Sequence, residues 1–131
     1  MSVIADLESR LSSKVPEVLG ITRIVSALIF MAHGTQKLFA FPDGGKSAVD
    51  LFSIFGLAGI LEVFGGIPLL LGIFTRPVAF VLSGMMAVAY WFFHFPKSFF
   101  PINNGGDAAI LYCFLFLLFV FTGPGRFAFK K

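Results

Sequence analysis

The stretch RIVSALIFMAHGTQKLFAF, residues 23–41, decides the fold of this chain. Its composition predicts a membrane-spanning helix, although it contains Arg23, His33 and Lys37. A charged side chain at the centre of a bilayer costs roughly 2.5–3.5 kcal/mol, so such groups must face protein, water or the interface. Because successive helical residues advance by about 100°, positions 23, 26, 30, 33 and 37 lie along one side. This polar stripe therefore predicts partners on neighbouring helices.

The composition of the whole chain supports a membrane protein. Of its 131 residues, 57% are hydrophobic and 13% are charged, whereas a soluble domain carries about 25% charged residues. The length predicts one domain. The basic residues that give the net charge of +3 are scattered beside the apolar segments, so no nucleic-acid partner is expected. Cys113 is the single cysteine, which excludes a disulfide framework or a cysteine metal site within one chain.

Four apolar segments predict four spans, at about residues 18–41, 54–74, 77–93 and 107–122. The expected fold class is therefore all-α, an integral membrane four-helix bundle over residues 18–127 with a basic tail at 128–131. Apolar residues recur at helical spacing in residues 1–17, which predicts a short amphipathic helix on the membrane surface; a frayed tail is the alternative. The second half of the loop at residues 42–53 is expected to form a short interfacial helix.

The distribution of basic residues predicts the orientation. An even number of spans puts both termini on one side, and seven basic residues lie there: Arg10, Lys14, Arg23, Arg76, Arg126, Lys130 and Lys131. The opposite side has three, Lys37, Lys46 and Lys97. Cytoplasmic segments carry the excess of Lys and Arg, so both termini are expected in the cytoplasm.

The remaining polar groups are expected to meet in the outer half of the bundle. Glu62 is the one charged residue of the second span, about 12 Å from its outer end at 1.5 Å per residue, and His33 has a similar depth. Lys37 lies one turn closer to the surface and could reach Glu62. The predicted binding cluster comprises His33, Lys37, Glu62, His94, Asn104, Asp107 and Tyr112.

Structural roles are the alternative for each of these groups. Glu62 could form an ion pair with Lys37 or a hydrogen bond to His33, because a buried carboxylate needs a partner or a proton. Lys37 could instead extend to the interface as an anchor, and His94 could be an interfacial histidine. Arg23, near the cytoplasmic face, is expected to bind a lipid phosphate or to anchor the end of its helix. No metal-binding motif is present, so no metal site is expected.

The order of these motifs resembles the DoxX family of small four-helix bacterial membrane proteins. The matching stretches, over roughly residues 20–127, are Arg23 through Lys37 with AHGTQK inside it, LEVFGGIPLLLGIFTR (61–76), the aromatic end of the third span with His94, NNGGDAAILY (103–112) and GPGR (123–126). The recurring polar positions of that family correspond to Arg23, His33 or its neighbour Gly34, Lys37, Glu62 and His94. The resemblance implies a bacterial plasma (inner) membrane location.

The resemblance also implies a small membrane subunit of a redox system, since some relatives are named as a subunit of a thiosulfate–quinone oxidoreductase and others are linked to thiol and oxidative stress. The chain has no second cysteine and no haem, iron–sulfur or flavin motif. Electrons must then come from a partner redox protein or a soluble donor, with a quinone as the cofactor. Whether the chain is itself an oxidoreductase stays open. The alternatives are a non-catalytic scaffold for partner proteins and, less favoured, a small transporter or proton pathway; a homo-oligomer also stays open.

Overall fold

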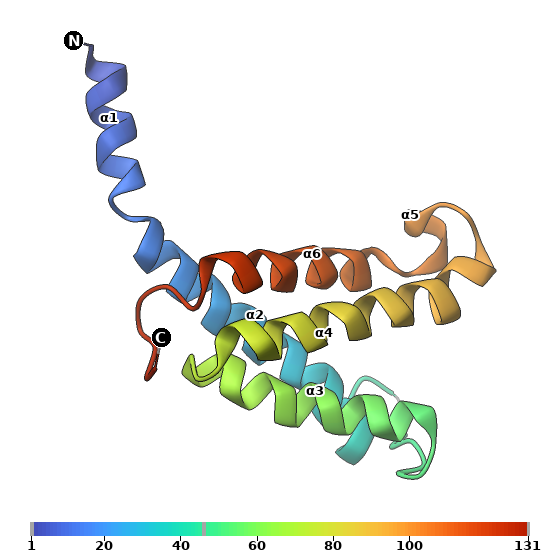
Figure 1. Cartoon of the computed structure of the whole chain (residues 1–131). Coiled ribbons are helices and arrows are strands. Elements are labelled where there is room, and N and C mark those ends of the chain that lie inside the picture. Colours follow the sequence, from blue (N-terminus) through green and yellow to red (C-terminus); the bar gives the residue numbers. More distant parts are fainter. Residues whose placement is uncertain (1, 46, 131) are drawn as a thin grey trace. The chain divides into compact units, whose positions relative to one another are not determined.

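The computed structural model describes residues 2–45 and 47–130, and every regular element in these residues is helical. The elements are α1 (Val3–Ser12), α2 (Val15–Phe39), α3 (Ile54–Leu71), α4 (Thr75–Ala89), the π-helix η1 (Tyr90–His94), the 3-10 helix η2 (Phe95–Lys97), α5 (Pro101–Asn104) and α6 (Asp107–Thr122), all shown in Figure 1. Three of them are long and apolar enough to cross a membrane: α2, α3 and the continuous helix Thr75–Lys97. At 16 residues α6 is shorter but also apolar. The expected all-α membrane fold is confirmed.

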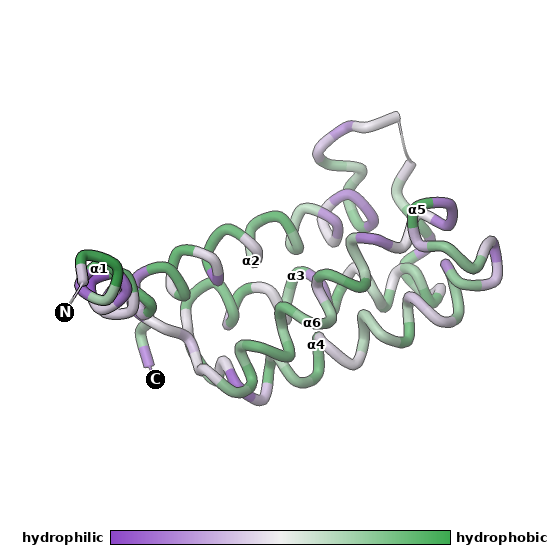
Figure 2. Tube along the Cα trace, turned by 90° about the horizontal axis from the view of Figure 1, so that it is seen from above, coloured by the Kyte–Doolittle hydropathy of each residue, from purple (hydrophilic) through white to green (hydrophobic). Residues whose placement is uncertain are grey.

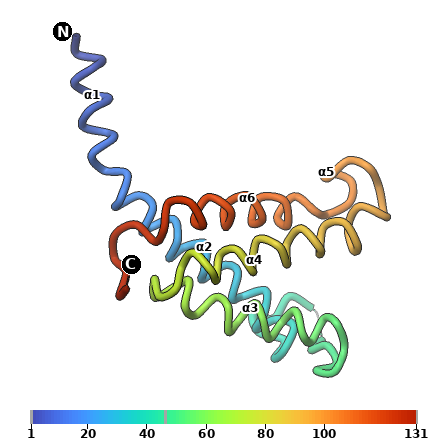
Figure 3. Tube along the Cα trace, in the orientation of Figure 1, coloured from blue at the N-terminus to red at the C-terminus, as the bar shows by residue number. Residues whose placement is uncertain are grey.

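The chain forms two compact units, which can be followed along the trace in Figure 3. The first unit comprises the described residues of Met1–Ile73 and Pro124–Lys131, and the second comprises Phe74–Gly123. The helices α2 and α3 pack together in the first unit, and α4 packs against α6 in the second. Figure 2 shows hydrophobic residues along these four helices, with hydrophilic residues concentrated in α1, the loops and the helix ends.

The first unit begins with the helix predicted in residues 1–17. Ser2 caps α1, accepting a 3.2 Å hydrogen bond from the Ala5 amide, and none of the helix is buried. Helix α2 then starts at Val15, earlier than predicted, because Pro16 occupies its first turn, where the missing amide hydrogen is tolerated. The prediction of a short helix in the second half of the loop at residues 42–53 is wrong. The structure has no helix there in the described residues, and the Val49 amide donates instead to the Lys37 carbonyl at 2.8 Å.

The buried side of α2 differs by one position from the predicted stripe. Its buried residues are Gly20, Arg23, Ser26, Ala27, Phe30 and Gly34. The spacing agrees with the prediction as far as Phe30, but at the next turn Gly34 is buried and His33 is exposed. On α3 the buried residues follow the same helical spacing: Gly56, Gly59, Glu62, Gly66 and Leu69. Three of these five are glycines. Glycine at these positions permits close helix packing.

In the second unit, α4 continues past its predicted end through η1 and η2 to Lys97. Ser83 of α4 donates a 2.7 Å hydrogen bond to the Cys113 carbonyl of α6. Arg76 donates to the carbonyls of Val120 and Phe121 at 3.0 and 2.9 Å. These carbonyls belong to the last turn of α6 and have no partner within the helix. Ser83 thus links the middle parts of the two helices, and Arg76 links the start of α4 to the end of α6.

Candidate functional site

The candidate site of the first unit depends on the close crossing of α2 and α3. A Cβ added to Gly34 would lie 2.8 Å from the Gly59 carbonyl oxygen and 2.9 Å from the Glu62 Cβ. A Cβ on Gly59 would lie 3.1 Å from the Lys37 Cβ. No side chain fits between the helices at Gly34. The two glycines thus bring Lys37 and Glu62 within reach of each other.

Lys37 and Glu62 form an ion pair across this crossing. The Lys37 Nζ donates to the Glu62 Oε1 at 2.6 Å. The Glu62 side chain is 5% exposed, whereas that of Lys37 is 29% exposed. A carboxylate buried this deeply needs such a charged partner. Of the roles left open by the sequence, the ion pair with Lys37 is therefore the one found, and Lys37 does not extend outward as an anchor.

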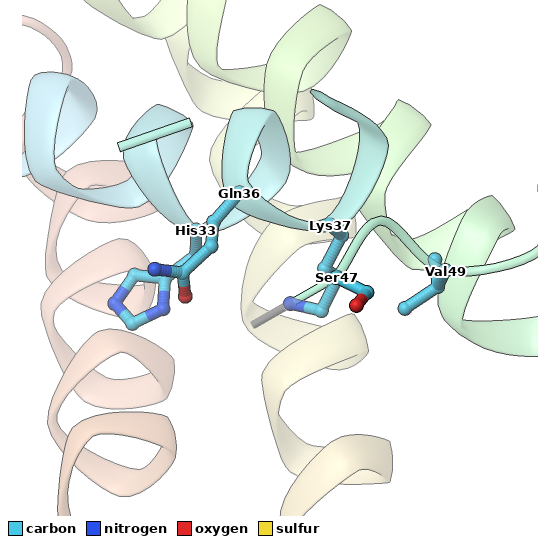
Figure 4. A pocket seen from close by; sticks show the side chains of 5 residues that line it. All are labelled: His33, Gln36, Lys37, Ser47 and Val49. Carbon is cyan, nitrogen blue, oxygen red and sulfur yellow. The ribbon is translucent and has the colours of Figure 1, made fainter. Parts of the chain in front are cut away.

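A pocket of about 200 Å³ adjoins the lysine. Its lining residues are His33, Gln36, Lys37, Ser47 and Val49 (Figure 4). The first three come from consecutive turns at the end of α2, and the other two come from the loop that the Val49–Lys37 backbone hydrogen bond holds against this end. Figure 4 shows the His33 and Gln36 side chains extending next to each other, with Lys37 near Ser47. Four of the five lining side chains can donate a hydrogen bond.

The second unit contains the other predicted site residues, but it groups only two of them. The His94 Nδ1 lies 3.1 Å from the Asn104 carbonyl oxygen. Asp107 is exposed in the first turn of α6. Tyr112 stacks on Phe116 with ring centroids 5.5 Å apart. The structure thus brings His94 and Asn104 together.

Arg23 has a structural role that the sequence left open. Its side chain is fully buried, which excludes the predicted lipid-phosphate contact. The guanidinium donates to the carbonyls of Leu69 (2.9 Å) and Leu70 (3.5 Å) at the end of α3. It also donates to three carbonyls of the C-terminal segment, those of Pro124, Arg126 (3.2 Å) and Phe127 (2.7 Å). Arg23 therefore joins this segment to α3, and its charge lies at the negative end of the helix dipole.

The same C-terminal segment satisfies the rest of the α3 end. The amides of Phe129 and Lys130 donate to the carbonyls of Leu71 and Gly72 at 3.0 and 3.2 Å. These are the acceptors that a helix leaves without an internal partner. Such groups are costly in a membrane, where water cannot replace the missing donor. The GPGR motif therefore starts a segment that completes the hydrogen bonding of α3.

Some residues of the candidate sites were missed from the sequence. Gln36 and Ser47 line the pocket, and the Tyr90 hydroxyl lies 3.1 Å from the Asn104 Nδ2. Tyrosine is common at the ends of membrane spans, so the position of Tyr90 in the sequence does not indicate its contact with Asn104. Among the residues that the structure describes, no group of His, Cys, Asp or Glu could hold a metal ion.

Comparison with known proteins agrees with the membrane fold. The family model described as DoxX matches residues 18–95. A protein of Haemophilus influenzae described as uncharacterized is 48% identical over 119 residues, which cover 86% of this chain and 88% of that protein. No solved structure matches the chain. The matched range includes α2, α3 and α4, and with them Arg23, Lys37, Glu62 and His94.

Proposed function

The chain belongs to the DoxX family, and from that premise we propose that it is a small membrane subunit of a redox system, with a quinone head group bound beside the Lys37–Glu62 pair. The observation that supports this proposal is the polar pocket itself, because it adjoins a buried ion pair between two largely apolar helices. A quinone carbonyl needs a hydrogen-bond donor. Lys37, Gln36 and Ser47 offer donors from two sides.

The size of the pocket limits what can bind. Sites for drug-sized ligands have volumes of roughly 300–1,000 Å³, so a pocket of about 200 Å³ holds a head group and leaves an isoprenoid tail outside. The apolar surface of α2 is suited to contact that tail. A bound quinone supplies a two-electron acceptor. The protein's own residues orient the head group, and the Lys37 ammonium places an exchangeable proton next to it, with Glu62 balancing its charge.

A variant that removes a hydrogen-bond donor from the pocket without breaking the ion pair gives the sharpest test. Gln36 lines the pocket, and among the described residues its side chain bonds to the Pro42 carbonyl alone, at 3.0 Å. Gln36→Leu should therefore remove this donor at similar side-chain size and leave Lys37–Glu62 intact. Asn103→Leu, an equivalent change at an exposed position of the second unit, is the control. The measurement is the thermal shift of the purified full chain with decyl-ubiquinone and a menaquinone analogue.

The expected result is a saturable shift that Asn103→Leu keeps and Gln36→Leu loses. A ligand at a hundred times its Kd stabilises a protein by about 2.7 kcal/mol, which a melting curve resolves. The proposal fails if neither quinone gives a shift, or if Gln36→Leu retains it in full.

A scaffold role is the second candidate, and the fixed C-terminal segment favours it. Arg23 holds residues 124–127 through their carbonyls, while Phe127 and Phe129 stay exposed. A partner protein could bind these two rings. Replacing both with serine should abolish co-purification of such a partner without changing quinone binding, whereas unchanged co-purification would count against the scaffold.

In the proposed orientation, both termini lie on the cytoplasmic side of the bacterial plasma membrane. In a Cys113→Ser background, Ser13→Cys and Asn103→Cys each introduce one cysteine at an exposed position on predicted opposite sides. A membrane-impermeant maleimide added to spheroplasts should label the cysteine at 103 and not the one at 13. The reverse pattern would invert the proposed topology.

A further inference from the structure

The widened turn η1 and the stretch Asn103–Gly106 form a second group of polar residues, in the second unit. Asn104 is 2% exposed and uses all its hydrogen-bonding directions but one. Its Nδ2 donates to the Ser98 carbonyl at 2.9 Å and to the Tyr90 hydroxyl at 3.1 Å, and its Oδ1 accepts from the Gly106 amide at 2.8 Å. These bonds fix which end of the amide is oxygen and which is nitrogen. Asn104 thus holds Tyr90 by donating to it.

The Tyr90 hydroxyl is left with a proton to donate. It accepts the hydrogen bond from Asn104 and makes no other within the described residues. A phenolic oxygen can both accept and donate. Tyr90 is 8% exposed, and a buried donor without an acceptor costs free energy. This proton is therefore available to a bound molecule.

The neighbouring His94 is left with an acceptor. Its Nδ1 faces the Asn104 carbonyl oxygen at 3.1 Å, and a carbonyl can only accept. Nδ1 must therefore carry the hydrogen, so in the neutral ring Nε2 has a free lone pair. No hydrogen bond to Nε2 occurs within the described residues. The Tyr90 and His94 rings lie nearly parallel, at 23°, with centroids 6.4 Å apart.

An apolar aromatic surface adjoins these two groups. Tyr90 contacts Trp91 and Phe95, and Phe95 contacts Phe99 in turn, with centroid separations between 5.4 and 6.4 Å. Trp91 and Phe99 are exposed. A molecule dissolved in the bilayer can thus contact exposed aromatic rings next to Tyr90 and His94. π-Helical turns such as η1 are frequent at functional sites.

From this arrangement we propose that Tyr90, His94 and Asn104 form a binding site for the hydroxyl group of a bilayer-soluble phenol. The hydroxyl oxygen accepts from Tyr90 O–H, and its hydrogen is donated to the His94 Nε2. A carbonyl or an ether can make only the first of these bonds. Gly106 lets the backbone pack directly against Tyr90, because a Cβ there would lie 2.6 Å from the tyrosine ring. That the natural ligand is a hydroquinone rests on the proposed function; the phenol site does not.

The tautomer of His94 can be measured directly. The chain contains two histidines, so ¹⁵N-histidine NMR of the full chain in nanodiscs gives two sets of ring signals, which His33→Phe assigns. The expected result at a pH where the ring is neutral is a His94 ring protonated on Nδ1. A ring protonated on Nε2 would overturn the proposal.

The ligand class is tested with 4-hexylphenol and its methyl ether, which differ only in the hydroxyl hydrogen. The phenol should shift the His94 Nε2 signal saturably, and the ether should bind roughly two- to twelvefold more weakly, the effect of one net hydrogen bond. Tyr90→Phe should weaken phenol binding by a similar factor, and Tyr112→Phe, the equivalent change at the other tyrosine, should not. Equal binding of phenol and ether, or no binding of either, would refute the site.

The outcomes separate this site from the proposed function. Phenol binding without any quinone shift would retain the Tyr90–His94 site and remove the quinone-linked role. A quinone shift that Gln36→Leu abolishes, with no phenol binding at His94, would retain the quinone-linked role and remove the Tyr90–His94 site. If Tyr90→Phe fails to fold, the tautomer and the phenol–ether comparison on the unmodified chain still decide.

Discussion

The close crossing at Gly34 permits a sharp test of how the Lys37–Glu62 site is built. In Gly34→Ala, the new methyl group would lie 2.7 Å from the Val63 Cγ2, 2.8 Å from the Gly59 carbonyl oxygen and 2.9 Å from the Glu62 Cβ. Two of these atoms belong to or adjoin the backbone of α3 and cannot rotate away. The helices must therefore move apart, which lengthens the 2.6 Å contact between Lys37 and Glu62.

The expected magnitude follows from two opposing effects. Overpacking a tight contact costs about 1–3 kcal/mol, while alanine in a helix interior gains about 0.8–1.0 kcal/mol over glycine. Gly84→Ala isolates the second effect, because a Cβ at that position of α4 would meet nothing within 4 Å. Since both variants share the gain in helix propensity, Gly34→Ala should be less stable than Gly84→Ala by about 1–3 kcal/mol.

The assay is unfolding of the purified protein in mixed micelles with increasing SDS, followed by helical circular dichroism. Gly84→Ala should unfold at the same or a higher SDS fraction than the unmodified chain, and Gly34→Ala at a lower one. Decyl-ubiquinone binding should weaken in Gly34→Ala alone. If the two alanine variants unfold together, the close crossing at Gly34 does not position the Lys37–Glu62 ion pair.

Three further substitutions test the buried polar groups. Arg23→Lys should lower the free energy of unfolding by roughly 2–4 kcal/mol, because one ammonium cannot reach carbonyls on both α3 and the C-terminal segment. The released C-terminal segment should be digested faster by carboxypeptidase. Digestion at the rate of the unmodified chain would contradict this prediction. Thr75→Val should be neutral or stabilising by up to about 1 kcal/mol, since the buried Thr75 hydroxyl has no hydrogen-bond partner among the described residues. A clear loss of stability in the same SDS titration would show that a partner exists. Asn104→Ala should lower the free energy of unfolding by about 1–3 kcal/mol, because it leaves buried groups such as the Gly106 amide without partners. Asn103→Ala, at the exposed neighbouring position, is the control. Equal melting of the two variants would argue against the hydrogen-bond network around Asn104.

The helices themselves were predictable because their signals are local. Length and hydropathy identified the apolar helices, and the fourth was predicted at residues 107–122, the bounds that α6 has in the structure. The ends at residues 15 and 97 were missed for local reasons as well. Pro16 lies in the first turn of α2, within residues predicted to precede the first span, and a π-turn carries the third helix beyond residue 93.

Part of the candidate site could also be predicted. An intramembrane Glu62 requires a partner, and Lys37 was the cation at a suitable depth, so their pairing followed from the cost of burying a charge. His33 and Lys37 were expected on one buried stripe of the helix. In the structure the stripe passes through Gly34 instead of His33, so His33 is exposed. Helical periodicity gives a face to within about one residue, and only the neighbouring helix decides which residue of that face is covered.

The sequence by itself determined the membrane class, the number of apolar helices and the need for partners around Arg23 and Glu62, because hydrophobic length and the cost of buried charge depend on residue type alone. Only the tertiary structure decided which partners these are. Arg23 binds carbonyls more than forty positions away, at Leu69 and in the C-terminal segment, and every residue has a carbonyl. The donor left on Tyr90 and the acceptor left on His94 likewise follow from the hydrogen bonds that these two side chains already make with Asn104.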